Sequence, residues 1–429
     1  MTDTVLAALA LLTIVWAVTS SRLADWDVTG ALVFLTAGFA LANPTWGPIR
    51  LDVESPSVHR LAELTLAMLL FADASRVDVS RLRRDVGVPA RLLGIGLPLS
   101  IVTGSVLAAW IFADATWALA LFVGAALGPT DAALSAQVVG DERVPGRVRR
   151  VLNVESGLND GIATPVVVFA LAVVAADLAP GVHAESAEGR ALLDLAVGLG
   201  VGLVVGPGAA LLVGLGAARR WVAPGGRRLA TLGAALGSFS LAVALDGNGF
   251  IAAFVAGAAF GAVLPRRPAE GDEAHEAEEV DEADEVDEAD EVEEAVVLPE
   301  LLGQLAGLAV WFLFGAALLP VALDHLSVAA VGYAVLSLTA VRMVPVAVAT
   351  LGAGLDRSTV LFIGWFGPRG LASVVFALLA VEELGESAVT GEAVAVIAWT
   401  VTLSVVLHGV SAGPLGARYR RTHQITHRG

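Results

Sequence analysis

Apolar segments close to the length that crosses a lipid bilayer follow one another along almost the whole sequence. A hydrocarbon core about 30 Å thick is crossed by about 20 helical residues, because each residue of an α-helix advances about 1.5 Å. By this criterion the chain contains about thirteen candidate spans. They are Thr4–Ser20, Val28–Ala42, His59–Ala72, Val88–Phe112, Thr116–Val139, Val151–Ala176, Leu192–Ala218, Leu229–Leu245, Phe250–Leu264, Leu301–Leu323, Ser327–Leu351, Thr359–Val381 and Glu392–Val410.

The composition agrees with a membrane protein. Soluble domains carry about 25% charged residues, whereas this chain has 16% charged and 56% hydrophobic residues. The sequence therefore predicts an all-α, polytopic membrane protein with about 13 transmembrane helices. The chain has no cysteine, which excludes disulfides, thiolate metal sites and cysteine nucleophiles. The net charge is −17, but sixteen of the acids lie between Glu270 and Glu294 and the remaining chain is near neutral, so we predict no nucleic-acid partner.

One long hydrophilic segment, 266–300, interrupts the apolar pattern and repeats the hexapeptide DEADEV in tandem from residue 281. Its self-repulsion predicts a disordered cytoplasmic loop, either a solvated linker or a segment that attracts cations or docks a partner. The segment separates an N-terminal membrane part, 1–265, from a C-terminal membrane part, 301–412. A basic cytoplasmic tail, 413–429, is expected to follow.

Arginine accumulates after the odd-numbered runs, and such clusters mark cytoplasmic loops. The clusters are Arg76, Arg81, Arg83 and Arg84; Arg143, Arg147, Arg149 and Arg150; Arg219, Arg220, Arg227 and Arg228; and Arg418, Arg420 and Arg421. This pattern predicts a multi-pass protein of the inner (plasma) membrane with its N-terminus outside and its C-terminus in the cytoplasm. The first run lacks a basic start and a clear cleavage site, so it is interpreted as a span and not as a signal peptide.

Polar groups inside apolar runs are the candidates for function, because a charge at the bilayer centre costs roughly 2.5–3.5 kcal/mol or more. These residues are Glu63, Asp73, Thr130, Asp131, Gln137, Asn153, Glu155, Ser156, Asn159, Asp160, Asp246, Asn248, Gln304, Arg342 and Arg369.

The densest polar cluster is Asn153–Gly161 in the sixth run. On a helix, Ser156 and Asp160 are four residues apart, as are Glu155 and Asn159, so one turn offers a carboxylate, a hydroxyl and an amide. Such oxygen ligands suit a hard cation. Removal from water favours the protonated form of a carboxyl group, and Asp160 could therefore exchange a proton for a cation. The alternative is that these groups only join helices through hydrogen bonds.

Two helix-breaking Gly-Pro pairs interrupt the fifth and twelfth runs, and each is followed by a charged residue. Pro129 precedes Thr130 and Asp131, and Pro368 precedes Arg369. Interrupted helices in corresponding positions of repeated halves mark a midplane site, and their opposed dipoles need charges of opposite sign. The pattern predicts two discontinuous helices, within 116–140 and 359–381, that Asp131 and Arg369 compensate; the alternative is a pair of simple proline kinks.

Other charged residues in the runs receive simpler interpretations. Arg342 needs a buried counter-ion. We choose Glu155, because this pairing leaves Asp160 free to titrate. Glu63 is placed at depth in the third run, and Asp73 near its cytoplasmic exit. His408 is interpreted as a packing residue and not as a metal ligand.

Five motifs in this order resemble the monovalent cation/proton antiporters of the prokaryotic NhaP type. They are GPTDAALSAQVV (Gly128–Val139), ESGLNDG (Glu155–Gly161), GNGFIAAFVAG (Gly247–Gly257), the lone Arg342 and GWFGPRG (Gly364–Gly370). The resemblance covers essentially the whole membrane region. It implies thirteen spans with inverted repeats, a homodimer with a dimerisation part and an ion-translocating core, and elevator-like alternating access.

The resemblance also implies roles for individual residues. Asp160 would be the ion- and proton-binding carboxylate. Further cation ligands would be Ser156, Asp131, the carbonyl of Thr130, and Glu63. Glu155 and Arg342 would form a structural ion pair that also holds Asn159. The order Asn159-Asp160, in place of two aspartates, resembles the electroneutral branch. The acidic segment lies outside the family pattern.

The sequence thus predicts a secondary active antiporter, not an enzyme, that exchanges Na+, or Li+ or K+, for H+ without a cofactor. A monovalent cation channel is the first alternative, and an intramembrane hydrolase is the second. The hydrolase would need a motif such as GxGD or HExxH, and the sequence has neither.

Overall fold

The computed structural model describes residues 3–51, 55–77, 87–112, 115–134, 144–178, 184–264, 291–385 and 388–426. Within these ranges the regular structure is helical and contains no β-strand, which confirms the all-α class. In the described part of the chain, seven helices are long and apolar enough to cross a membrane, and three shorter apolar helices accompany them. The seven are Asp3–Ala24, Gly87–Ile111, Gly146–Leu178, Ala187–Ala218, Glu294–Asp324, Val328–Ala349 and Thr390–Arg421.

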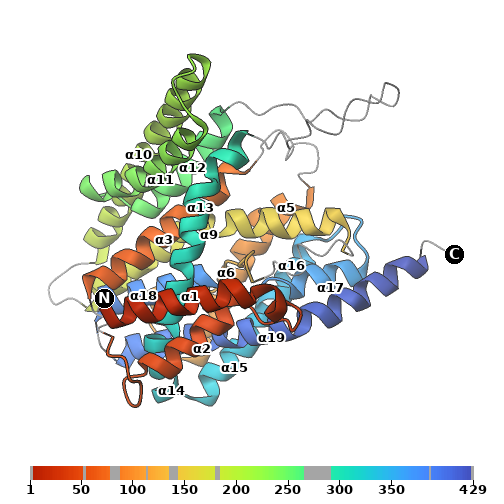
Figure 1. Ribbon diagram of the computed structural model, residues 1–429. Coiled ribbons are helices and arrows are strands. Elements are labelled where there is room, and N and C mark those ends of the chain that lie inside the picture. The colour runs from red at the N-terminus through yellow and green to blue at the C-terminus, as the bar shows by residue number, and fades with distance from the viewer. Residues whose placement is uncertain are drawn as a thin grey trace.

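The elements follow one another along the chain as shown in Figure 1. They are α1 (Asp3–Ala24), α2 (Gly30–Ala42), α3 (Pro56–Ser75), α5 (Gly87–Arg91), η1 (Leu92–Gly96), α6 (Leu97–Ile111), α7 (Trp117–Ala126), α9 (Gly146–Leu178), α10 (Ala184–Ala218), α11 (Pro224–Ala244), α12 (Gly249–Val263), α13 (Glu291–Leu313), η2 (Phe314–Leu318), α14 (Leu319–Asp324), α15 (Val328–Leu338), α16 (Ala340–Ala349), α17 (Arg357–Trp365), α18 (Leu371–Leu384) and α19 (Ala388–Thr426). The elements η1 and η2 are π-helical turns.

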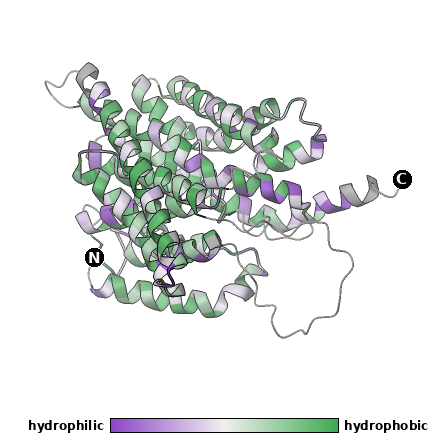
Figure 2. Cartoon of the chain, turned by 90° about the horizontal axis from the view of Figure 1, so that it is seen from above, coloured by the Kyte–Doolittle hydropathy of each residue, from purple (hydrophilic) through white to green (hydrophobic). Residues whose placement is uncertain are grey.

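Each predicted apolar run contains helix in the described residues, and the fifth and twelfth runs also contain irregular backbone. The number of bilayer crossings, the inverted repeats and the sidedness of the termini stay predictions. Residues 135–140 of the fifth run, with Gln137, and the arginines Arg81, Arg83, Arg84 and Arg143 lie outside the described residues. Figure 2 shows apolar residues along most of the helix lengths, with more hydrophilic residues toward several helix ends.

Short polar side chains begin several of the apolar helices. Thr29 accepts a hydrogen bond from the amide of Leu32 at the start of α2, and Thr116 does the same for Leu119 in α7. Asn248 caps α12 by accepting from the amide of Ile251 at 2.9 Å. These caps satisfy N–H groups that have no partner inside the helix.

Small residues allow the helices around α3 to pack closely. A Cβ atom at Gly257 of α12 would lie 2.3 Å from the carbonyl oxygen of Phe71, and one at Gly261 would lie 2.0 Å from that of Ser75. The backbones of α12 and α3 therefore touch, as is typical of small-residue contacts between membrane helices. Because α3 also contacts α9, α13 and α18, this packing fixes one side of the polar region described below.

The acidic segment ends earlier than predicted. The sequence indicates a loop that continues to residue 300, but Glu291–Glu300 already belongs to α13. Its acids have partners there: Glu300 pairs with Arg76 of α3, and Glu294 pairs with Arg228 of α11 at 3.2 Å. These ion pairs and the apolar residues Val292, Ala295 and Val296, which are buried, stabilise helix where charge density alone predicts a loop. Residues 265–290 lie outside the described residues.

The predicted basic tail, 413–429, is helical where the structure describes it. Residues 413–426 continue α19. The Tyr419 ring stacks on Phe362 of α17 with centroids 4.3 Å apart, and its hydroxyl lies 2.7 Å from Oγ1 of Thr359. This aromatic contact holds the beginning of the tail against the bundle and extends the helix.

Candidate functional site

The polar residues of α9 divide into a buried set and a partly accessible carboxylate. Glu155, Ser156 and Asn159 are buried, whereas Asp160, one residue further along, is partly accessible. The helix places Glu155 and Asn159 on one line of its surface and Ser156 and Asp160 on the next.

Glu155 pairs with Arg342 of α16, which confirms the counter-ion predicted from the sequence. The two guanidinium nitrogens donate to the two carboxylate oxygens at 2.5 and 2.9 Å. The side chains are only 2% and 3% exposed. Such a bidentate, buried pair joins α9 to α16 rigidly, because either charge alone would be costly in this environment.

Asn159 is held differently from what the resemblance implies. Its amide nitrogen donates to Oγ1 of Thr130 at 2.7 Å, and that hydroxyl lies 3.0 Å from Oγ of Ser156. Thr130 thus joins two side chains of α9 to the chain that follows α7. The structure has no hydrogen bond between Asn159 and the Glu155–Arg342 pair, and the side-chain oxygen of Asn159 has no partner in the described residues. The resemblance implies one group of Glu155, Arg342 and Asn159. The structure instead has the Glu155–Arg342 pair and, beside it, a group in which Asn159 bonds to Thr130.

Helical structure stops in both segments that the Gly-Pro pairs predict to be interrupted. α7 ends at Ala126, and irregular backbone follows to the last residue described there, residue 134. α17 ends at Trp365 and α18 begins at Leu371. The two irregular segments lie against each other, because the amide of Asp131 donates to the carbonyl of Pro368 at 2.8 Å.

The charged residue of each irregular segment bonds to the backbone of the other. Oδ2 of Asp131 accepts from the amide of Leu371, at the first residue of α18, at 2.9 Å. Nη1 of Arg369 donates to the carbonyls of Gly128 and Pro129, just beyond α7, at 2.5 and 2.9 Å. An anion thus lies at a helix N-terminus and a cation at exposed carbonyls near a helix C-terminus, the arrangement that helix dipoles favour. Arg369 is completely buried.

Three aspartates from different segments face the same region. The charges of both Asp131 and Asp73 act on Asp160. A Cβ atom at Gly157 of α9 would lie 3.7 Å from the Cβ of Asp73, which places that residue directly against the helix. All three aspartates are partly accessible. The carboxylates of Asp73 and Asp160 form no hydrogen bond or ion pair with any residue in the described ranges.

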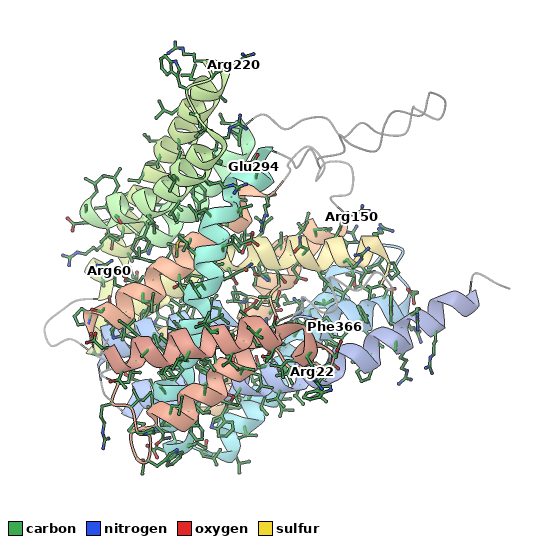
Figure 3. All side chains as sticks on the ribbon, viewed as in Figure 1. Arg22, Arg60, Arg150, Arg220, Glu294 and Phe366 are labelled. Carbon is green, nitrogen blue, oxygen red and sulfur yellow. The ribbon has the colours of Figure 1, made fainter. Side chains whose placement is uncertain are left out.

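Glu63 does not belong to this group. It forms an ion pair with Arg60 at 2.9 Å, and its neighbouring charges are those of Glu382 and Glu383. Arg60 lies at the end of the bundle opposite to Arg150 (Figure 3). Since Glu63 and Asp73 are ten residues apart on one helix, about 15 Å along its axis, only Asp73 reaches α9. The proximity of Asp73 to Gly157 depends on the packing of α3 on α9, which no local sequence signal reveals.

Two serines and a histidine also hold the two irregular segments, and the sequence did not indicate this role for them. Oγ of Ser373 donates to the carbonyl of Ala126 at 2.6 Å, which links α18 to the end of α7. Oγ of Ser404 in α19 accepts from the amide of Arg369 at 2.7 Å. His408, interpreted from the sequence as a packing residue, contacts the carbonyl of Trp365 at 2.8 Å. The available signal was a serine in the twelfth apolar run and a serine and a histidine in the last one.

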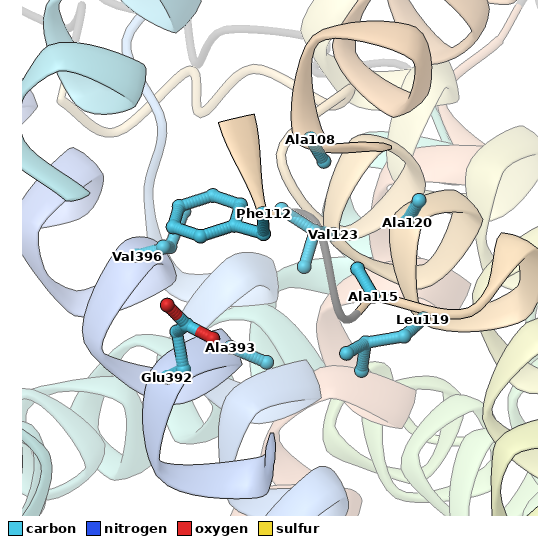
Figure 4. Close-up of a pocket in the computed structure, with 9 residues that line it drawn as sticks. All are labelled: Ala108, Phe112, Ala115, Leu119, Ala120, Val123, Glu392, Ala393 and Val396. Atoms are coloured by element: carbon cyan, nitrogen blue, oxygen red, sulfur yellow. The ribbon is translucent and has the colours of Figure 1, made fainter. Parts of the chain in front are cut away.

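A small cavity elsewhere in the bundle lies between the ends of α6 and α7 and the start of α19 (Figure 4). Its lining is apolar except for Glu392, and it includes none of the three aspartates. In the described part of the chain, no three His, Cys, Asp or Glu side chains converge as a metal cage would require. The region around Asp160 thus offers single carboxylates and neutral oxygens, and not a closed multi-carboxylate site.

Comparison with known proteins gives consistent matches. The family described as "Sodium/hydrogen exchanger, transmembrane" matches residues 7–418. The K(+)/H(+) antiporter NhaP2 of Shewanella sp. (strain ANA-3) is 26% identical over 251 residues, 58% of this chain and 42% of that protein. The K(+)/H(+) antiporter NhaP of Alkalimonas amylolytica is 30% identical over 178 residues, 41% of this chain and 30% of that protein. The chain thus matches less than half the length of these curated relatives.

A solved structure extends the likeness to the whole fold. The sodium proton antiporter MjNhaP1 from Methanocaldococcus jannaschii at pH 8 superimposes with a TM-score of 0.74, covering 97% of this chain and 98% of that one. The sequence identity is 18%.

Proposed function

Because the chain belongs to the sodium/hydrogen exchanger family, we propose that it exchanges a monovalent cation for protons across the membrane and performs no enzymatic reaction. The observation that carries this proposal is the carboxylate of Asp160, which bonds to no residue of the described part of the chain and lies beside buried hydroxyl and amide groups. A carboxylate in such a place binds either a proton or a cation, and one site that binds both in turn couples their movements. Na+, Li+ and K+ are the candidate cations, and the names of the curated relatives favour including K+.

The proposed cation ligands are the carboxylate of Asp160, the hydroxyl of Ser156 and backbone or side-chain oxygens of Thr130 and Asp131. Asp131 already accepts three backbone hydrogen bonds, so it would act through its charge and remaining lone pairs. We assign the further carboxylate to Asp73, in place of Glu63, because Asp73 lies against α9 and pairs with no residue among those that the structure describes.

Neutral Asn159 supports an electroneutral cycle. One cation in exchange for one proton leaves Asp160 with the same net charge in both loaded states. The Asn159 amide contributes a hydrogen bond to Thr130 and no second titratable charge. Exchange should then not be driven by membrane voltage.

We also propose in which membrane the protein lies and on which side of it each terminus lies. We place the protein in the inner (plasma) membrane as a homodimer, with the N-terminus outside and the Arg-rich ends and C-terminus in the cytoplasm. Arg150 and the C-terminus lie toward the same end of the bundle (Figures 1 and 3), which supports this sidedness. Alternating access would move the helices that carry the polar region relative to the remainder.

Everted vesicles test exchange directly. After respiration acidifies the lumen, addition of Na+, Li+ or K+ should release protons, and Asp160→Asn should abolish the release while the protein still inserts. Asp177→Asn is the matched control, because Asp177 is an exposed acid on the same helix. Release at the wild-type rate by Asp160→Asn would disprove the assigned site.

Proteoliposomes separate exchange from a channel and test electroneutrality. A pH gradient alone should drive cation uptake in an exchanger. An imposed voltage without a gradient of a transported cation should move no protons. Proton movement that follows the voltage would refute the electroneutral cycle, and cation flux that follows voltage without proton movement would indicate a channel.

A further inference from the structure

His408 occupies an unusual position for a histidine in an apolar helix. It is 2% exposed, and it lies in α19 against the irregular segment between α17 and α18. None of the proposed cation ligands touches it. Its nearest charged groups are two cations, Arg369 of the irregular segment and Arg342 of α16, and the latter is paired with Glu155.

Both ring nitrogens of His408 face backbone carbonyl oxygens. Nδ1 lies 2.9 Å from the carbonyl oxygen of Ser404, and Nε2 lies 2.8 Å from that of Trp365. A carbonyl oxygen only accepts hydrogen bonds, and a neutral imidazole has only one N–H. Both contacts are hydrogen bonds only when the ring carries two protons. In the neutral ring with its proton on Nε2, Nδ1 would accept from the hydroxyl of Ser404 at 3.3 Å, while its lone pair would face the nearer carbonyl oxygen of Ser404 at 2.9 Å.

Two further features favour the charged ring. The indole of Trp365 stacks on it, with centroids 5.1 Å apart and planes 28° apart, and an aromatic face attracts a cation. Trp365 is also the last residue of α17, at the helix end that carries partial negative charge, and its carbonyl accepts from the amide of Gly367 at 2.8 Å as well. The two arginines and the burial oppose the charge, so the proton is held by these specific contacts and is lost as pH rises.

The contacts of His408 control both sides of the irregular segment. On one side it holds the carbonyl that ends α17. On the other, Ser404 accepts from the amide of Arg369 and lies 3.3 Å from Nδ1. Two residues later, the amide of Leu371 binds Asp131. A shift of this segment therefore moves the partner of an aspartate that neighbours Asp160.

We propose that His408 is a positioning residue: its second ring proton holds the segment between α17 and α18 in place, so that cation binding depends on the protonation of a group outside the binding site. The transport consequence rests on the proposed function. The protonation of the ring and the stiffness of the segment do not, and they are measured without transport.

The first test uses the unaltered protein in nanodiscs. Nitrogen NMR of labelled histidine, with the His408 signal assigned by its loss in His408→Gln, should show a doubly protonated ring at about pH 5 that becomes neutral by about pH 8. Over the same range, amide hydrogen exchange in residues 365–371, corrected for its intrinsic pH dependence, should speed up by about tenfold, as expected for loss of one hydrogen bond to a charged group. A ring that stays neutral throughout overturns the proposal, and so does a charged ring whose titration leaves exchange unchanged.

The second test compares the apparent KM for the cation in His408→Gln and in wild type across the same pH range. Glutamine keeps one donor and one acceptor but cannot be charged. The ratio of the two KM values should be about ten in acid, where the wild-type ring is charged, and approach one in alkali. A residue that only fills space would give a constant ratio, and that result would overturn the proposal.

His325→Gln is the matched control. His325 makes the same contact with a carbonyl four residues earlier, at 3.1 Å, but it is exposed and contacts no second carbonyl. Its KM ratio should stay near one at every pH. If the wild-type protein exchanges no cation for protons, the proposed function is wrong. The NMR measurement alone then decides the role of His408.

Discussion

The buried pair of Glu155 and Arg342 gives the sharpest test of the structure. With about 4 Å between the charge centres and an effective dielectric constant of about 20, the attraction is about 4 kcal/mol. Removing one partner leaves a buried, uncompensated charge and should cost about 3–5 kcal/mol. Arg342→Met and Glu155→Gln should therefore each lower the melting temperature by about 6–10 °C, at roughly 2 °C per kcal/mol for a chain of this size. The double variant buries no charge and should be more stable than either single variant.

Thermal unfolding in one detergent, followed by tryptophan fluorescence, measures all four proteins. The pair Arg228 and Glu294 is the control, because its side chains are 43% and 35% exposed. Breaking that pair should cost about 1 kcal/mol or less. If the loss in the double variant of Glu155 and Arg342 equals the sum of the two single losses, the residues are not coupled and the bidentate pair is refuted.

Three further predictions concern the site and the packing around it. If protons and cations compete at Asp160, the apparent cation affinity should weaken as pH falls, by up to about tenfold per unit; an affinity that is constant between about pH 5 and 8 contradicts competition. Asp73→Asn should raise the apparent KM for the cation by about tenfold, whereas Glu63→Gln should leave it near the wild-type value, and the reverse result would restore Glu63 as the ligand. Gly261→Ala should lower stability by about 1–3 kcal/mol because its methyl group meets the α3 backbone, while Gly208→Ala, with open space around it, should be neutral or slightly stabilising in the same melting assay.

The all-α fold was predictable because each apolar run is recognisable from its own residues, without knowledge of its tertiary contacts. About 20 apolar residues leave few structures other than a membrane helix, since every backbone group needs a partner in the bilayer. The errors lie at the ends of helices, where local charge competes with tertiary contacts. Charge density predicts a loop up to residue 300, yet Arg76 and Arg228 neutralise two of those acids and the helix begins at Glu291.

Some contacts of the candidate site were predictable from charge. A lone arginine in an apolar run needs a partner, which leads from Arg342 to Glu155, whereas two backbone carbonyls accept from Arg369. The Gly-Pro pairs lead to the opposed charges of Asp131 and Arg369, but not to the crosswise bonds that they form. The sequence did not show that Asp73, and not Glu63, lies against α9, because both are acids in one short run and only the packing of α3 on α9 distinguishes them.

The residues that form the stabilising contacts are far apart in sequence, so the two partners of a contact are synthesised at different times. Glu155 precedes Arg342 by 187 residues, and Gly128 precedes Arg369 by 241. At about 5–20 residues per second, the ribosome takes about 10–40 s to make the partner of Glu155 after the glutamate itself. During this time the sixth run contains a carboxylate with no counter-ion, and it enters the bilayer protonated or remains near the translocation machinery. Chains truncated before residue 342 should therefore be poorly retained in the membrane and be degraded early.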